Sequence, residues 1–182
     1  MEEEQISQQS HVIKWGLIIG IINIIVVLLV YMVDVTMMVG FSFLGIFLVL
    51  NIALIIYAGI EWRKASGGFL SFKSAFTTTF FTFVVAGLLG TVFNLLLYNV
   101  IDTGLSETLT DASIEQAESM MERFGMPEDQ MDEALEKARA DATDRFSIGG
   151  QLMGFVYGLI FYAIISLIVG AIIKKKNPEE EI

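Results

Sequence analysis

The segment "GGFLSFKS", residues 67–74, carries the residue types of a phosphate-binding loop. A P-loop needs the spacing G-x-x-x-x-G-K-[ST], in which a glycine directly precedes the lysine. Here Lys73 follows a phenylalanine, and the nearest glycine, Gly68, lies five positions earlier. The spacing excludes a P-loop. We predict instead a membrane hinge between two spans, in which Arg63, Lys64 and Lys73 form a basic collar. The alternative is a cytoplasmic site at which these three residues contact the headgroup of a membrane lipid.

The other reactive side chains are few. The chain has no cysteine and one histidine, His11, which the sequence places in a polar N-terminal leader. Metal sites need clusters of His, Cys or carboxylate ligands, and a hydroxyl nucleophile such as Ser166 needs a base beside it. The sequence shows neither arrangement. We therefore expect no enzyme activity, no catalytic residue, and no bound metal or cofactor.

Any functional residues of this chain must be held in place by its four long apolar segments. Their ranges are 15–33, 37–60, 75–101 and 146–173, and none contains Asp, Glu, Lys, Arg or His. About 20 apolar residues cross the hydrocarbon core as a helix, whereas a soluble helix would carry charge on one face. The predicted fold class is therefore all-α, an integral membrane four-helix bundle formed by residues 1–182 as a single domain.

The basic residues predict the orientation of these spans. They flank the membrane on one side in three short segments, at Lys14, at Arg63, Lys64 and Lys73, and at Lys174, Lys175 and Lys176. Cytoplasmic loops carry the excess of Lys and Arg, so both termini are expected in the cytoplasm of a bacterial inner (plasma) membrane. No larger basic patch exists, which argues against a nucleic-acid partner and favours membrane lipid.

The polar segment between the third and fourth spans, residues 105–145, is strongly acidic. From Asp102 to Arg145 it holds 13 acidic and 4 basic residues, and apolar residues recur at helical spacing in two runs. Two amphipathic helices are expected, separated by Gly125 and Pro127. We predict an extracytoplasmic helical hairpin. It is either a solvated cap or a docking surface for a protein partner, and calcium binding is the weakest alternative because no EF-hand loop is present.

Small and polar residues lie within the predicted spans. Asn23 and Asn51 fall at the same depth in two oppositely running helices, which predicts a side-chain bond between them, whereas Asn94 lies near the other face. The glycines at 150, 154 and 158 recur every four residues in the last span. Both sets are interpreted as structural, holding helices together, because the asparagines form two separate layers and no continuous polar path.

Two classes of function remain open from these residues. The first is a non-enzymatic interaction or structural component of the membrane. The second is a small-solute channel or transporter subunit, which would need a homo-oligomer because four packed spans leave little room for a pore.

Several motifs together resemble the family known as domain of unknown function 4199. They are "GGFLSFKSAF", "LYNVID", "MERFGMPEDQMDEALEKA" and the final "KKKNPEE". The family often has a serine where residues 126–127 are Met-Pro here. The resemblance implies a four-span bacterial inner-membrane protein, and it implies no activity and no catalytic residue.

Overall fold

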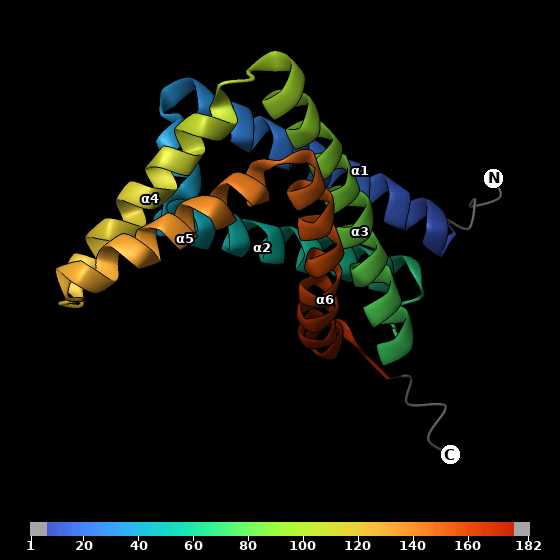
Figure 1. The fold of residues 1–182 in the computed structure, drawn as a ribbon. Coiled ribbons are helices and arrows are strands. Elements are labelled where there is room, and N and C mark those ends of the chain that lie inside the picture. The colour runs from blue at the N-terminus through green and yellow to red at the C-terminus, as the bar shows by residue number, and fades with distance from the viewer. Residues whose placement is uncertain (1–6, 177–182) are drawn as a thin grey trace. The chain divides into compact units, whose positions relative to one another are not determined.

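The computed structural model describes residues 7–176, apart from the side chain of Asp129. It is helical, with no strand in the described range, which confirms the predicted all-α class (Figure 1). The elements in chain order are α1 (Gln8–Val33), η1 (Val35–Val39), α2 (Phe41–Ala65), α3 (Phe72–Leu96), η2 (Leu97–Ile101), α4 (Leu105–Arg123), α5 (Glu128–Phe146) and α6 (Ile148–Ile173).

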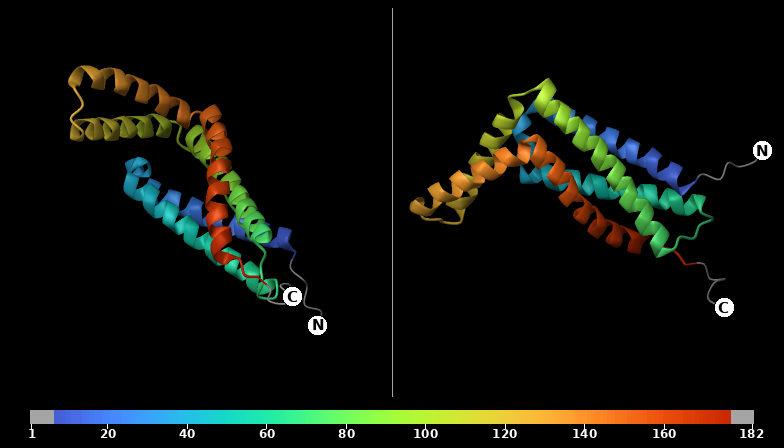
Figure 2. Two further views of the ribbon diagram at one scale, coloured as in Figure 1. Left: turned by 90° about the horizontal axis from the view of Figure 1, so that it is seen from below. Right: turned by 45° about the vertical axis from the view of Figure 1, so that its right-hand side comes forward.

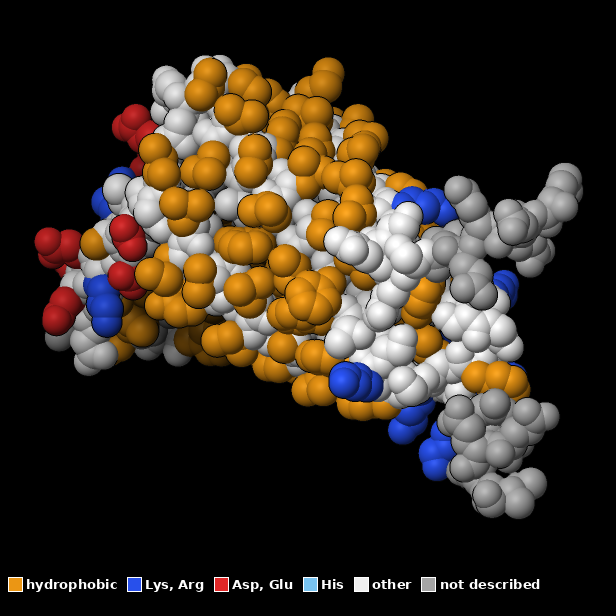
Figure 3. Space-filling view, turned by 90° about the vertical axis from the view of Figure 1, so that its right-hand side faces the viewer, with side chains coloured by type: hydrophobic (Ala, Val, Ile, Leu, Met, Phe, Trp, Pro, Cys, Tyr) orange, Lys and Arg blue, Asp and Glu red, His pale blue; other side chains and the backbone are white. Residues whose placement is uncertain are grey.

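Four of these helices are long and apolar enough to cross a membrane. They are α1, α2, α3 continued through η2, and α6, with 26, 25, 30 and 26 residues. At 1.5 Å per residue, 26 residues span about 39 Å, which exceeds the roughly 30 Å hydrocarbon core. Figure 3 shows hydrophobic side chains spread over the outward faces of the helices, as expected for helices surrounded by lipid rather than water.

Local sequence explains where the long helices begin and end. After α1, the Asp34 carboxylate accepts hydrogen bonds from the backbone N–H and the hydroxyl of Thr36, at 2.9 and 2.7 Å, and so caps the short η1. After α2, Gly67 and Gly68 adopt φ values of +81° and +87°, which favour glycine. The Ser71 hydroxyl then accepts from the Ser74 N–H and caps α3.

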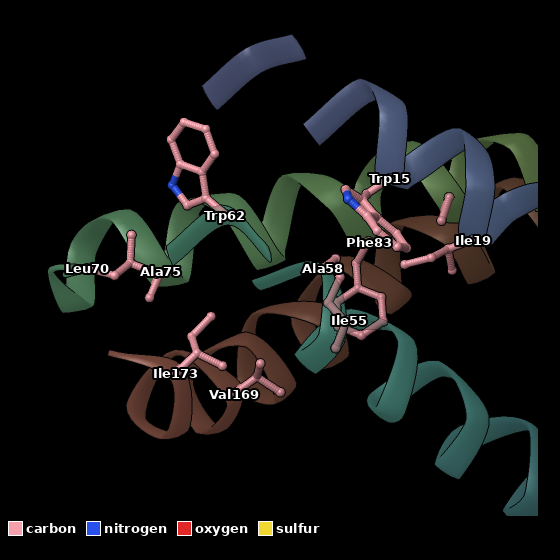
Figure 4. Packing of buried hydrophobic residues seen from close by; sticks show 11 residues of the cluster. Trp15, Ile19, Ile55, Ala58, Trp62, Leu70, Ala75, Phe83, Val169 and Ile173 are labelled. Carbon is pink, nitrogen blue, oxygen red and sulfur yellow. The ribbon is translucent and has the colours of Figure 1, made fainter. Parts of the chain in front are cut away.

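The chain divides into two compact units, each with its own core. Unit 1 comprises residues 1–24, 47–90 and 156–182, and unit 2 comprises residues 25–46 and 91–155. The core of unit 1 draws buried side chains from all four long helices, among them Ile19, Ile55, Phe83 and Val169 (Figure 4). Two residues outside those helices also matter, because Leu70 and Lys175 form a β-bridge that ties the loop after α2 to the chain after α6.

Within unit 1, α1 and α3 run parallel and in register. Gln8 bonds Thr77, Gly16 abuts Val85, and Gly20 abuts Leu89. The second residue of each pair lies 69 positions after the first. Glycine is required at the last two contacts, because a side chain on either residue would overlap the facing one. Gln8, the first residue of α1, is therefore level with Thr77 in the second turn of α3, which begins five residues earlier at Phe72.

Unit 2 is built around the two amphipathic helices α4 and α5, which lie side by side (Figure 2). Gly125, at φ +69°, follows α4, and the Met126 N–H reaches back to the Met121 carbonyl at 3.0 Å, which is the Schellman ending of a helix. Pro127 is the N-cap residue directly before α5, so it lies with Gly125 between the two helices, as the sequence predicts. An Arg139–Asp111 ion pair of 2.8 Å joins the two helices.

Candidate functional site

The structure brings Asn23 and Asn51 together. Each amide donates to the other's carbonyl oxygen, at 2.9 Å from Asn23 and 3.1 Å from Asn51. The Asn51 amide also donates to the Phe47 carbonyl at 2.9 Å, and Asn51 itself is only 9% exposed. Both amides thus use their bonding capacity on each other within apolar helices, which is what interhelical fastening requires.

The other predicted intramembrane residues are not brought into this pair. Asn94 is half-buried in α3, and its side chain has no hydrogen bond in the described part of the chain. Gly150 lies against the backbone of Asp144, where the chain turns from α5 into α6. An added side chain at Gly154 would meet nothing, and one at Gly158 would meet only Tyr162 of the same helix. Neither glycine meets another helix within the described residues, so the helix packing predicted for them stays a prediction.

The three cations predicted to contact lipid have different environments. The Arg63 guanidinium donates to the Ile173 carbonyl at 3.1 Å and so caps the C-terminal end of α6. The side chains of Lys64 and Lys73 are exposed, and neither forms an ion pair or a cation–π contact within residues 7–176. Arg63 therefore has a structural partner, whereas the two lysines remain available to a ligand.

Sequence reasoning missed the environment of His11. The structure places it inside α1 and leaves it 2% exposed, with its ring centroid 5.2 Å from that of Trp62. Its Nε2 lies 2.9 Å from the Ala58 carbonyl oxygen, which only accepts, so Nε2 carries the proton. The signal was the buried series 11, 12, 15, 16, 19 and 20, which has helical spacing and begins at the histidine.

A groove between α1 and α3 lies beside this polar network. We call it the α1–α3 groove; its volume is about 520 Å³ and its lining residues are Gln8, Gln9, Val12, Ile13, Lys73, Thr77, Phe81 and Val85. The Gln8 amide closes its polar end by donating to the hydroxyls of Thr77 and Thr78, at 3.0 and 2.8 Å. Sequence alone did not indicate it, because it depends on the parallel register of two helices.

A second groove lies in unit 2, between α4 and the chain around η1. We call it the methionine groove; its volume is about 410 Å³ and its lining residues are Val39, Phe41, Leu44, Ser113, Gln116, Ala117, Met120, Met121, Phe124, Met126 and Arg145. Phe124 is 83% exposed at the end of α4. Methionine side chains adapt to partners of varied shape, and an exposed aromatic in an acidic segment needs an explanation.

Two catalytic arrangements, a metal cluster and an activated Ser166, can be checked against the described residues. No group of three or more His, Cys, Asp or Glu side chains within them is placed to hold a metal ion. The Ser166 hydroxyl is fully buried, and neither a base nor any other polar partner lies within hydrogen-bonding distance of it. What the geometry offers is binding at the two grooves, each of which is lined mainly by apolar side chains and one cation.

The fold and these features define a helical protein with four membrane-length helices. A family model described as "Protein of unknown function (DUF4199)" matches residues 14–175, and the chain belongs to this family. No curated protein and no solved structure matches the chain. The resemblance drawn from the sequence motifs is thereby confirmed, while the family supplies no activity to transfer to the grooves.

Proposed function

We propose that the protein is a non-enzymatic, multi-pass component of the bacterial inner membrane that binds a protein partner through the methionine groove. The observation that carries the proposal is the exposed apolar lining of this groove within an acidic segment. Exposed apolar patches of this kind mark interaction sites when polar residues surround them. Phe124, with Met120 and Met121 on the same turn of α4, would be the anchoring side chains.

Charge selects the partner's chemistry. Residues 102–145 carry 13 acidic and 4 basic side chains, a net charge of −9, and the groove itself contains one of the cations, Arg145. A partner that fits is an amphipathic segment with an apolar face and flanking Lys or Arg residues. The distribution of basic residues supports an extracytoplasmic position for this groove and a cytoplasmic position for both termini.

Photocrosslinking in native membranes tests the proposal. A photoreactive amino acid at Met121 lies in the groove, and the same probe at the neighbouring Glu122, which is exposed and does not line it, is the matched control. We expect a protein adduct from position 121 and none from 122. Phe124→Glu should remove the adduct without unfolding the chain, because this side chain is exposed.

The identity of the crosslinked peptide decides the outcome. An amphipathic peptide that carries Lys or Arg, with an adduct that weakens at high salt, supports the proposal. An adduct between two copies of this chain, lipid adducts alone, or equal adducts from both positions would overturn it.

The channel or transporter alternative has less support. Asn23 and Asn51 bond to each other, so neither amide is left over to line a polar path. A solute flux through purified, reconstituted protein that disappears in Asn51→Leu would replace our proposal with this alternative.

A further inference from the structure

The polarity of the α1–α3 groove changes in one direction along both of its walls. On α3 the lining residues Lys73, Thr77, Phe81 and Val85 follow at steps of four, so they form one line about 18 Å long that runs from cation to hydroxyl to aromatic to aliphatic. On α1 the lining residues change in the same direction, from the glutamines at positions 8 and 9 to the aliphatic side chains at positions 12 and 13. Because α1 and α3 run parallel and Gln8 bonds Thr77, the polar residues of both walls lie at the same end of the groove.

This gradient matches a membrane lipid better than a water-soluble ligand. The polar end lies in the first turns of two membrane-length helices, where headgroups meet the hydrocarbon core, and the apolar end lies deeper within the same helices. A nucleotide or sugar would leave its polar groups against Ile13, Phe81 and Val85 without partners. An acyl chain has no polar groups, so it loses no hydrogen bonds when it is buried against these side chains.

Charge complementarity fixes the class of lipid. Lys73 is the only cation among the described residues that line the groove, and its ammonium has no ion-pair partner in residues 7–176. Lys14, in contrast, pairs with Glu61 at 3.3 Å, and Arg63 caps α6. The N-terminal end of α3, which begins at Phe72, adds positive partial charge beside Lys73. None of the described residues that line the groove is a carboxylate. A single negative phosphate is therefore the headgroup that this site can neutralise.

We propose that the α1–α3 groove binds one anionic phospholipid, with its phosphate at Lys73 and one acyl chain between Ile13 and Phe81. The volume of about 520 Å³ lies within the 300–1,000 Å³ typical of small-molecule sites. The site lies in unit 1 and uses no residue of the methionine groove. A failure of the lipid proposal would therefore leave the proposed protein partner unaffected, and the reverse also holds.

The test measures which lipid stays with the full-length protein. Protein is reconstituted in mixed phosphatidylglycerol and phosphatidylcholine vesicles, extracted, and analysed by native mass spectrometry for bound lipid. We expect one phosphatidylglycerol per chain, and Lys73→Gln should weaken its retention roughly five-fold, the effect of one charge at a membrane surface. Lys64→Gln removes a similarly exposed and unpaired cation outside the groove and should leave retention unchanged.

A second variant separates the acyl-chain contact from the charge. Ile13→Trp fills the apolar part of the groove from a half-exposed position, so the helix should still fold. We expect it to reduce retention of both lipids. Unchanged retention in Lys73→Gln, or equal losses in Lys73→Gln and Lys64→Gln, would overturn the proposal, since the latter result indicates diffuse surface attraction only.

A third variant tests whether the acidic N-terminal segment competes with the lipid. Replacing Glu2, Glu3 and Glu4 by glutamine removes its charge while keeping the full chain. We expect phosphatidylglycerol retention in this variant to change less than two-fold. Retention that appears only in this variant would show that the chain's own N-terminal segment occupies the groove, and would overturn the proposal.

Discussion

The Asn23–Asn51 pair gives a quantitative prediction about the stability of unit 1. Its two reciprocal amide bonds, at 2.9 and 3.1 Å, join α1 to α2 in an apolar setting. Measured bonds of this kind between membrane helices average about 0.6 kcal/mol each and reach about 1.7 kcal/mol. We therefore expect a coupling free energy of about 1–2 kcal/mol between the two side chains, a factor of roughly 5–30 in the folding equilibrium.

A double-mutant cycle with Asn23→Leu and Asn51→Leu isolates this coupling. Leucine is more favourable than asparagine in lipid whatever its neighbours. The stability of a single variant therefore combines this gain in transfer free energy with the loss of the Asn–Asn bonds. The structure also predicts an order. Asn51→Leu leaves the Asn23 amide with no partner, whereas Asn23→Leu leaves Asn51 bonded to the Phe47 carbonyl. Asn51→Leu should therefore be the more destabilising single change.

The assay is reversible unfolding of the purified protein in mixed micelles, followed by circular dichroism. Asn94→Leu is the matched control, because the Asn94 side chain has no hydrogen bond in the described residues and should show no coupling to Asn51. If the double variant equals the sum of the single variants within about 0.5 kcal/mol, the bonds do not fasten the helices and the reasoning is refuted.

Two further predictions follow from close contacts and from charge. Gly59→Ala would push a methyl group into the buried Ile173 side chain and should lower the unfolding free energy by about 1–3 kcal/mol, and Ile173→Val should restore part of it in a thermal unfolding assay; a double variant no more stable than Gly59→Ala contradicts this. The hydrogen bonds from the Thr36 hydroxyl and backbone N–H hold the pKa of Asp34 below the ordinary value of an aspartate side chain. Because they favour the carboxylate, their stabilisation is present above the unfolded-state pKa and is lost as pH falls through the folded-state pKa. In a carboxyl-carbon NMR titration Thr36→Val should move the Asp34 midpoint upward, and an unmoved midpoint would show that the hydroxyl bond is not its cause.

The sequence predicted those features that depend on composition and helical spacing alone. The charge-free runs indicate four membrane-length helices, because lipid excludes ionisable side chains from such segments. The depths of Asn23 and Asn51 follow from the fixed rise per residue of a helix, so their contact could be predicted from the sequence alone. Both inferences use only position along a helix.

Features that depend on tertiary contacts could not be predicted in the same way. His11 looked like part of a polar leader, and what makes it an interior residue is the Ala58 carbonyl and the Trp62 ring on another helix. The glycine spacing in α6 is equally suited to packing within the chain or against another molecule, and the structure leaves Gly154 open. A repeat of small residues therefore identifies a face without identifying what covers it.

The hydrogen bonds at the polar end of unit 1 show how Lys73 differs from the polar side chains around it. Gln8 fastens α1 to α3, His11 fastens α1 to α2, and the Trp62 indole donates to the Ser74 hydroxyl at 3.3 Å and fastens α2 to α3. Each of these bonds pairs a polar group with another group of the same unit. Lys73 takes no part in these bonds and forms no ion pair within residues 7–176, which agrees with the proposed role of its ammonium as the partner of a negatively charged ligand.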